Sequence, residues 1–241
     1  MKRNSVTVAL AFTCASFLGT AACMAGTVVK EKRETGTFQK ISTGDGIDVY
    51  FTQSDSYSVV VEADEKYIDL IVTEVKGETL VVKRKEKMRR HFIFNSRLKV
   101  HVSAPALTGV SSGGGSDFHA EHLKCDGSFQ MNVSSGSDVH IANLSVAGDA
   151  DISASSGSDC HIKNLQTRNC KLSSSSGSDL HVEISASGNL EASASSGSDL
   201  YLGGKADKVE VSASSGSDVD IKKLTYSTIN THQSSGGDVN R

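Results

Sequence analysis

The sequence has few large or rigid side chains: it contains no tryptophan, one proline and only 5% aromatic residues in 241. A compact globule of this length normally builds its core from large apolar side chains, so their shortage argues against one thick core. Narrow stacked layers filled by Val, Ile, Leu, Ala and Ser do not need them, and 22 glycines can supply sharp corners. The composition therefore favours a layered architecture.

The two halves of the chain differ in charge. Residues 1–103 hold 16 Lys and Arg against 12 Asp and Glu, a net of +4, whereas residues 104–241 hold 9 against 16, a net of −7. An acidic surface repels the phosphate backbone, so the sequence argues against nucleic acid as a partner.

The first 25 residues have the pattern of an export signal. Lys2 and Arg3 precede an uncharged apolar run at 6–18, which is too short to span a bilayer stably. Cys23 follows Thr-Ala-Ala and resembles the lipidated cysteine of a bacterial lipoprotein, although the usual Leu three places earlier is absent. Cleavage by an ordinary signal peptidase near residue 22 or 25 is the alternative. We expect export to the periplasm, outer membrane or surface of a Gram-negative bacterium, with membrane attachment only through a lipid on Cys23.

Five cysteines reduce to three, Cys125, Cys160 and Cys170, once Cys14 and Cys23 are assigned to the leader. Their spacings match no zinc pattern. Cys160 directly follows a repeat aspartate, where other copies carry Phe, Val or Leu, so we expect a small buried hydrophobe there. A Cys160–Cys170 disulfide is the alternative in an oxidising compartment.

A Ser-Ser-Gly-Ser-Asp turn, or a close variant of it, recurs seven times in the C-terminal half. The interval from one copy to the next is nearly constant along this half, as expected of a solenoid repeat. The flanks alternate with a period of two, which is the mark of a strand with one buried face. The copies end at Asp117, Asp138, Asp159, Asp179, Asp199, Asp218 and Asp238.

A repeat of about 20 residues with two or three short strands is the size of one coil of a parallel β-helix, whereas helical repeats are longer and have a 3.6-residue period. The fold class predicted is therefore all-β: a single-chain parallel β-solenoid with a β-rich N-terminal portion. Alternation places Ile152, Ala154, Cys160 and Ile162 inside, and Ser153, Ser155 and His161 outside.

The repeat turns are expected to be structural. Glycine tolerates the positive φ of a sharp corner, and the flanking Ser and Asp can bond neighbouring backbone amides. Equivalent corners should then stack about 4.8 Å apart, in register from coil to coil. The residues assigned to this role are Gly136, Asp138, Gly157, Asp159, Gly177, Asp179, Gly197, Asp199, Gly216 and Asp218.

Residues 27–103 are predicted to be a β-rich N-terminal part of the solenoid or its cap, and residues 104–241 the repeat solenoid itself. Turn signals at 44–46 and 76–78 separate alternating segments in the first part, and residues 66–70 are compatible with one helical turn. Strands are predicted at 37–42, 46–53, 56–62, 79–85 and 98–104.

The leader, the segment Phe-Gln-Lys-Ile-Ser-Thr-Gly-Asp-Gly-Ile-Asp-Val-Tyr-Phe-Thr-Gln at 38–53 and the serial Gly-Ser-Asp turns resemble the auto-transporter adhesin head (GIN) domain family, common in Bacteroidetes. The resemblance covers nearly the whole mature chain. It implies a single-chain β-helical fold and an extracytoplasmic location. It names no ligand and carries over no functional residue.

A histidine column is the first candidate binding site. The second residue after the repeat aspartate is histidine in four consecutive copies, so these imidazoles should stack on one outer face, close enough to share a metal ion or to titrate together. A strand-facing polar position that simply tolerates histidine is the alternative, and we assign no metal. The four are His119, His140, His161 and His181.

The aspartate column and a basic run are the other two candidates. Stacked carboxylates repel unless each accepts backbone hydrogen bonds or a cation lies among them, and the turn-forming role is favoured over calcium. The basic run at 83–91 could contact anionic glycan or lipid head groups, or could be a solvated hairpin tip. Its cations are Lys83, Arg84, Lys85, Lys87, Arg89 and Arg90.

The sequence favours a non-enzymatic adhesin-like binding or scaffold protein that needs no cofactor. Its acidic residues recur in every coil, which marks them as scaffold, whereas an active site should interrupt the repeat at one place. Gly203-Gly204 and the basic run are the clearest interruptions, and neither supplies a carboxylate pair with a base. A pectinase-like β-helix acting on polysaccharide is the alternative function. The expected partner is a glycan or an envelope or host-surface protein, and the oligomeric state is left open.

Overall fold

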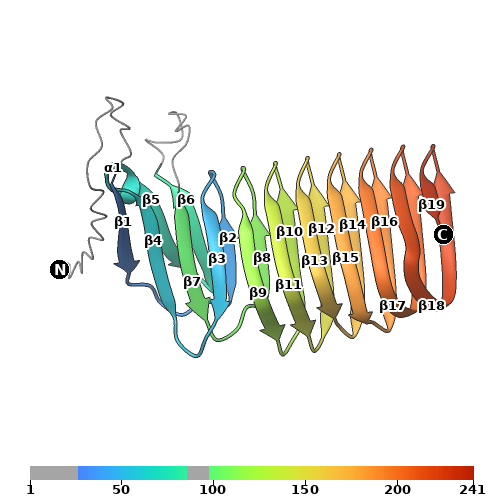
Figure 1. Ribbon diagram of the computed structural model, residues 1–241, viewed down its shortest axis with the longest axis horizontal. Coiled ribbons are helices and arrows are strands. Elements are labelled where there is room, and N and C mark those ends of the chain that lie inside the picture. The colour runs from blue at the N-terminus through green and yellow to red at the C-terminus, as the bar shows by residue number, and fades with distance from the viewer. Residues whose placement is uncertain (1–26, 86–97) are drawn as a thin grey trace, which may run out of the picture.

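The computed structural model describes residues 27–85 and 98–241 as an elongated, nearly all-β solenoid (Figure 1). The predicted export signal at 1–25, the lipidation candidate Cys23 and the cations Lys87, Arg89 and Arg90 lie outside the described residues. Within the described residues there is no helix long and apolar enough to cross a membrane.

The N-terminal part contributes seven strands and one short helix. They are β1 (Val28–Arg33), β2 (Lys40–Thr43), β3 (Asp48–Gln53), β4 (Ser58–Asp64), α1 (Glu65–Ile68), β5 (Ile71–Lys76), β6 (Thr79–Arg84) and β7 (Lys99–Ala104). The repeat part contributes β8 (Gly109–Ser112), β9 (Phe118–Cys125), β10 (Phe129–Ser134), β11 (Asp138–Val146), β12 (Asp149–Ser155), β13 (Asp159–Gln166), β14 (Asn169–Ser175), β15 (Asp179–Ala186), β16 (Asn189–Ser195), β17 (Asp199–Ser214), β18 (Asp218–Ser234) and β19 (Asp238–Asn240).

Each repeat coil has two strands, which lie in two different ladders. One ladder runs β9-β11-β13-β15 and continues through the first halves of β17 and β18 to β19. The other runs β8-β10-β12-β14-β16 and continues through the second halves of β17 and β18. All these pairs are parallel, and Asp138 pairs with Asp159, its counterpart in the next repeat. The predicted parallel β-solenoid, with one sequence repeat per coil, is confirmed.

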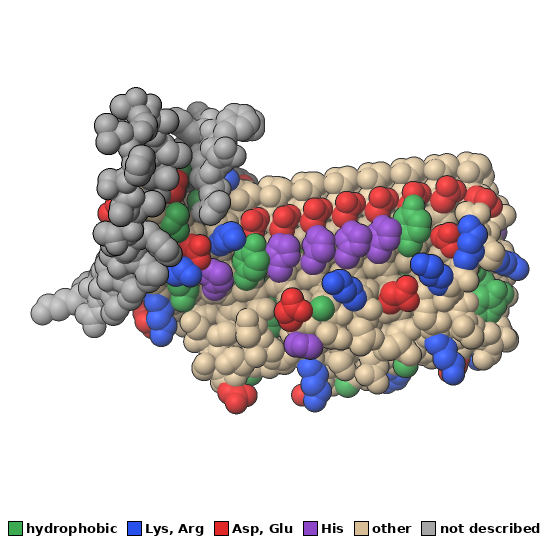
Figure 2. All heavy atoms as spheres, in the orientation of Figure 1, with side chains coloured by type: hydrophobic (Ala, Val, Ile, Leu, Met, Phe, Trp, Pro, Cys, Tyr) green, Lys and Arg blue, Asp and Glu red, His purple; other side chains and the backbone are tan. Residues whose placement is uncertain are grey.

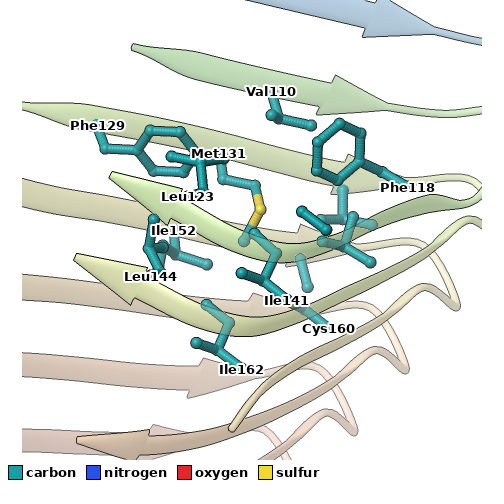
Figure 3. Close-up of a cluster of buried hydrophobic side chains, with 14 of the residues drawn as sticks. Val110, Phe118, Leu123, Phe129, Met131, Ile141, Leu144, Ile152, Cys160 and Ile162 are labelled. Carbon is teal, nitrogen blue, oxygen red and sulfur yellow. The ribbon is translucent and has the colours of Figure 1, made fainter. Parts of the chain in front are cut away.

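The space between the two ladders is a narrow apolar core. Ile152, Cys160 and Leu172 are completely buried, and Ala154 and Ile162 are 2% exposed, so the predicted alternation holds. Large rings enter this core mainly near the first repeat coils, where Phe118 and Phe129 pack with Met131 (Figure 3). Later coils are filled by Leu, Val, Ile and Ala, which explains how the chain folds without tryptophan.

The corners depend on two consecutive left-handed residues and one buried serine. Ser156 and Gly157 have φ of 61° and 65°, as in the type I′ turns that join strands tightly. The amide of Gly136 donates to the carbonyl of Ser156 at 3.2 Å, so successive corners lie one rung apart. Ser158, which follows the corner glycine, is fully buried. Its Oγ donates to the Val133 carbonyl of the preceding coil at 3.0 Å.

The N-terminal coils are stacked out of sequence order. Strands β2 and β3 lie between β6–β7 on one side and β8–β9 on the other. Beyond them β1, β4 and β5 run antiparallel to their neighbours and end the stack. Two of these strands, β1 and β5, were not among the predicted ones, and the helical turn lies at Glu65–Ile68, slightly earlier than the predicted 66–70.

Cys125, Cys160 and Cys170 are all free and buried, so a Cys160–Cys170 disulfide is not formed. Burial raises the pKa of both the Cys160 and the Cys170 thiol to about 12. Their thiols are therefore small core groups rather than reactive ones.

Candidate functional site

One outer face of the solenoid carries an unbroken row of stacked rings. It lies on the first ladder, where parallel pairing places the second residue after each repeat aspartate directly beside its counterpart. Figure 2 shows the histidines as a row along the solenoid, beside a row of carboxylates. We call the stacked residues the ring row: His101, Tyr50, His119, His140, His161, His181 and Tyr201.

The rings are stacked face to face. Their centroids are 4.3 to 5.6 Å apart, and neighbouring planes differ by 10° to 29°. The spacing follows the rung spacing of the ladder, about 4.8 Å. Because the faces are used in stacking, the ring edges are what the row presents to solvent. Tyr201, at 41% exposed, and His140 are the two exposed residues of the row.

The stacked geometry does not favour a metal site. Across residues 27–85 and 98–241, no group of three or more His, Cys, Asp or Glu side chains is arranged to hold a metal ion. Stacked imidazoles point in parallel rather than toward a common centre, so the ring row offers an extended surface instead.

Burial and neighbouring rings hold down the pKa of two histidines in the row. Burial is the main cause for His161, followed by the repulsion that a charged His181 or His140 would exert. Burial and then His140 likewise lower the pKa of His119. Proton uptake by these rings therefore needs a more acidic solution than the ordinary value of 6.5 implies.

The repeat aspartates form a second row parallel to the rings. Asp117 Oδ1 accepts a hydrogen bond at 3.1 Å from the amide of Asp138 in the next coil. Burial, followed by the charges of Asp159 and Asp199, raises the pKa of Asp179. We call this second row the aspartate file. It includes one residue that the repeat count missed, Asp48. Its members are Asp48, Asp117, Asp138, Asp159, Asp179, Asp199, Asp218 and Asp238.

A notch of about 450 Å³ opens on the other side of the ring row. Its wall includes the rings of His161, His181 and Tyr201, and Lys163, Glu183, Gly203, Lys222 and Lys223 contribute to the rest of its lining. A second hollow of about 370 Å³ runs from Tyr50 to Lys163, and both hollows are lined by His140, His161 and Lys163. The two together form one groove beside the rings.

The notch lies where the pairing register shifts by one residue, between β13 and β15 and between β17 and β18. Lys163 and Asn164 of β13 oppose Glu183 alone in β15, because Ile162 pairs with Val182 and Leu165 with Ile184. Similarly, Ile221 and Lys222 of β18 oppose only Leu202 in β17.

Gly203 deepens this interruption. It has no side chain, and the carboxylate of Glu183 lies 2.3 to 2.5 Å from where a Cβ at 203 would be. Of the Gly203-Gly204 interruption seen in the sequence, Gly203 lines the notch, and the Glu183 carboxylate occupies the space that its side chain would fill.

The basic run has separate surroundings at the N-terminal end. Lys83 Nζ lies 3.4 Å from Glu74 Oε1, and the amide of Arg84 donates to Asp45 Oδ2 at 3.1 Å. Lys85 is exposed and directly follows β6. The described part of this run is thus engaged with the cap and lies outside the groove lining.

Comparison with known proteins places this fold in a defined group. The family model described as "Putative auto-transporter adhesin, head GIN domain" matches residues 37–149 and again 149–240. No curated protein matches the chain.

Solved structures share the architecture at low sequence identity, so this similarity shows the fold alone. A putative adhesin from Bacteroides fragilis has TM-score 0.68 and 19% identity, covering 86% of this chain and 96% of its own. A putative adhesin from Parabacteroides merdae has TM-score 0.71 and 16% identity, with coverage of 90% and 96%. A structure named a putative lipid binding protein, from Parabacteroides distasonis, has TM-score 0.61 and 14% identity, with coverage of 90% and 97%.

Proposed function

We propose that this chain, which belongs to the "Putative auto-transporter adhesin, head GIN domain" family, is an exported adhesin-like module that binds a glycan chain lengthwise along its ring row. The observation that carries the proposal is the continuity of the row and its groove. From Tyr50 to Tyr201 the groove follows five rungs, roughly 24 Å at about 4.8 Å each. A linear polymer fits such a surface better than a compact small molecule does.

The chemistry of the groove suits sugars. Polysaccharides present apolar C–H patches and many hydroxyls, and recognition sites combine apolar or aromatic surface with a few placed polar groups. The ring edges supply imidazole nitrogens and two phenols, and the flanking column supplies Glu121, Lys163 and Glu183. Regular spacing along the stack allows the same contacts to recur with successive sugar units.

Binding without turnover is favoured over catalysis. Of the notch-lining residues only Glu183 and Asp220 are carboxylates, and Asp220 Oδ2 is paired with Lys222 Nζ at 3.3 Å. The repeat aspartates recur in every repeat coil, and the carboxylates of Asp48 and Asp117 accept hydrogen bonds from backbone amides. These features support a binding role over the pectinase-like alternative.

Export and surface display are part of the proposal. They are supported by the leader-like segment before residue 26 and by the adhesin family. Cell fractionation with metabolic labelling by a fatty-acid analogue would test both the location and the lipid on Cys23. Label lost in Cys23→Ser would support anchoring, whereas a processed, unlabelled protein would support ordinary cleavage.

A glycan array with mature protein tests the binding role. We expect retention on linear polysaccharides, with no released product on prolonged incubation, and loss of retention in a His161→Ala/Tyr201→Ala variant. His122→Ala is the matched control, because His122 is exposed on β9 outside the ring row. The absence of glycan binding would refute the proposal, release of shortened product would favour the enzyme, and capture of envelope proteins alone would favour a protein partner or scaffold role.

A further inference from the structure

The notch is where the regular surface of the ring face is interrupted. Here the register shifts between β13 and β15 and between β17 and β18, and the Glu183 carboxylate occupies the space that a side chain at Gly203 would fill. A volume of about 450 Å³ lies within the range of small-molecule sites, about 300 to 1,000 Å³. A notch of this size has room for one or two units of a longer chain.

The charges of the notch differ from those of the rest of the C-terminal half. Lys163 is contributed by β13 on one side, and Lys222 and Lys223 by β18 on the other. Lys222 is paired with Asp220, whereas Lys163 and Lys223 form no ion pair with another residue that the structure describes. The lining therefore holds three lysines against two carboxylates, in a half of the chain whose net charge is −7.

The aspartate file does not line the notch. Along each strand it lies two residues before the ring position, on the opposite side of the row from the notch. At physiological ionic strength the field of exposed charges falls off over about 8 Å. A negatively charged ligand group on the notch side of the ring row is therefore closer to the notch lysines than to the aspartate file.

We infer that the notch selects acidic sugars: Lys163 and Lys223 hold the carboxylates of a uronic-acid-type glycan, while Glu183 accepts hydrogen bonds from its hydroxyls. This inference rests on the proposed glycan binding and adds the class of ligand. Glu183 makes no hydrogen bond or ion pair with another described side chain, so its oxygens are available to sugar hydroxyls. The rings of His181 and Tyr201 supply the wall against which the sugar packs.

The test is isothermal titration of the mature protein with two oligosaccharides of the same backbone and length. An oligogalacturonate carries one carboxylate per unit, and its methyl ester carries none. We expect about tenfold tighter binding of the acid, weakening as salt is raised from about 50 to about 500 mM, because two exposed ion pairs contribute modestly and are screened. In a Lys163→Gln/Lys223→Gln variant the ratio of acid to ester affinity should fall to about one.

A matched variant separates local from general charge effects. Lys208→Gln removes an exposed lysine from the second ladder and should leave both affinities unchanged. Equal binding of acid and ester, or an undiminished acid preference in the double variant, overturns this inference and leaves lengthwise glycan binding intact. Binding of neither oligosaccharide overturns this inference, and the glycan array then decides whether the proposed function also fails.

Discussion

The ring of His181 stacks on that of Tyr201 with centroids 4.3 Å apart and planes 10° apart, the closest contact in the ring row. Tyr201 also donates from its hydroxyl to Asp199 Oδ2 at 3.3 Å, which links the row to the aspartate file. At the next rung Asp220 takes the ring position, so the stack ends there. The last two rings are therefore both the end of a structural stack and the wall of the notch.

Replacing His181 by alanine should weaken the solenoid locally. The imidazole contacts His161 at 4.6 Å and Tyr201 at 4.3 Å, and each stacked pair contributes about 0.5 to 1.5 kcal/mol beyond its buried area. We expect a loss of about 1 to 3 kcal/mol in urea unfolding followed by circular dichroism. His181→Phe should retain most of the stability and His122→Ala should change little. A phenylalanine variant as unstable as the alanine one would contradict the stacking argument.

Gly204 should tolerate alanine far less well than a corner glycine does. Its φ is +93°, and a Cβ there would lie 2.0 Å from the Ile184 carbonyl oxygen, so the strand itself must shift. Gly157 also has a positive φ, but a Cβ there meets nothing within 4 Å. We expect Gly157→Ala to cost about 1 to 2 kcal/mol, the strain of the left-handed conformation alone. Gly204→Ala should cost clearly more in the same denaturation assay, and equal costs would refute the close approach.

The repeat period was enough to predict the parallel coils but not their order in space. Asp138, Asp159 and Asp179 follow one another at a nearly constant interval, and parallel register turns that interval directly into stacked corners. The position of β3 between β7 and β9 depends on pairing with strands distant in sequence, on which a local period carries no information.

For the same reason, the sequence analysis did not identify two members of the ring row, Tyr50 and His101. Asp48-Val49-Tyr50 has the same Asp, buried residue, ring pattern as Asp117-Phe118-His119, and this was the available signal for Tyr50. His101 belongs to the ring row only because β7 pairs with β3. The sequence indicated the notch only as an interruption at Gly203-Gly204, because the register shifts between β13 and β15 and between β17 and β18 depend on how strands pair across coils.

The serine that follows the corner glycine should contribute more to stability than the serines on the surface. Ser198 is completely buried, and its Oγ donates to the Ser174 carbonyl at 2.9 Å and accepts from the Ser195 amide at 3.1 Å. Ser198→Ala leaves these backbone groups without that partner, which costs about 1 to 3 kcal/mol. Ser193→Ala removes only a half-exposed contact with Ser173 Oγ and should cost less than about 0.5 kcal/mol. Similar midpoints for the two variants would show that the corner serine is dispensable.

Stability should fall as the solution is acidified from about pH 7 to about pH 5, and the ring row should account for part of the fall. The pKa of His161 is lowered by burial first and then by His181 and His140, while Asp159 and Asp138 oppose the shift. The unfolded chain therefore binds protons more readily, so the stabilisation is present above the ordinary value of 6.5 and is lost as pH falls through the folded pKa.

The carboxyl group of Asp179 acts in the opposite direction. The raised pKa of Asp179 favours the folded state in acid, and that stabilisation is lost as pH rises through the folded pKa.

Thermal melts between about pH 7 and about pH 5 test the contribution of His161. The decline in stability should be shallower for His161→Phe, which keeps a ring in the stack but cannot take up a proton. His122→Gln, a change outside the row, should retain the wild-type slope. An undiminished slope in His161→Phe would mean that the acid sensitivity comes from elsewhere in the fold, because the phenylalanine ring preserves the stacking and removes only the titrating group.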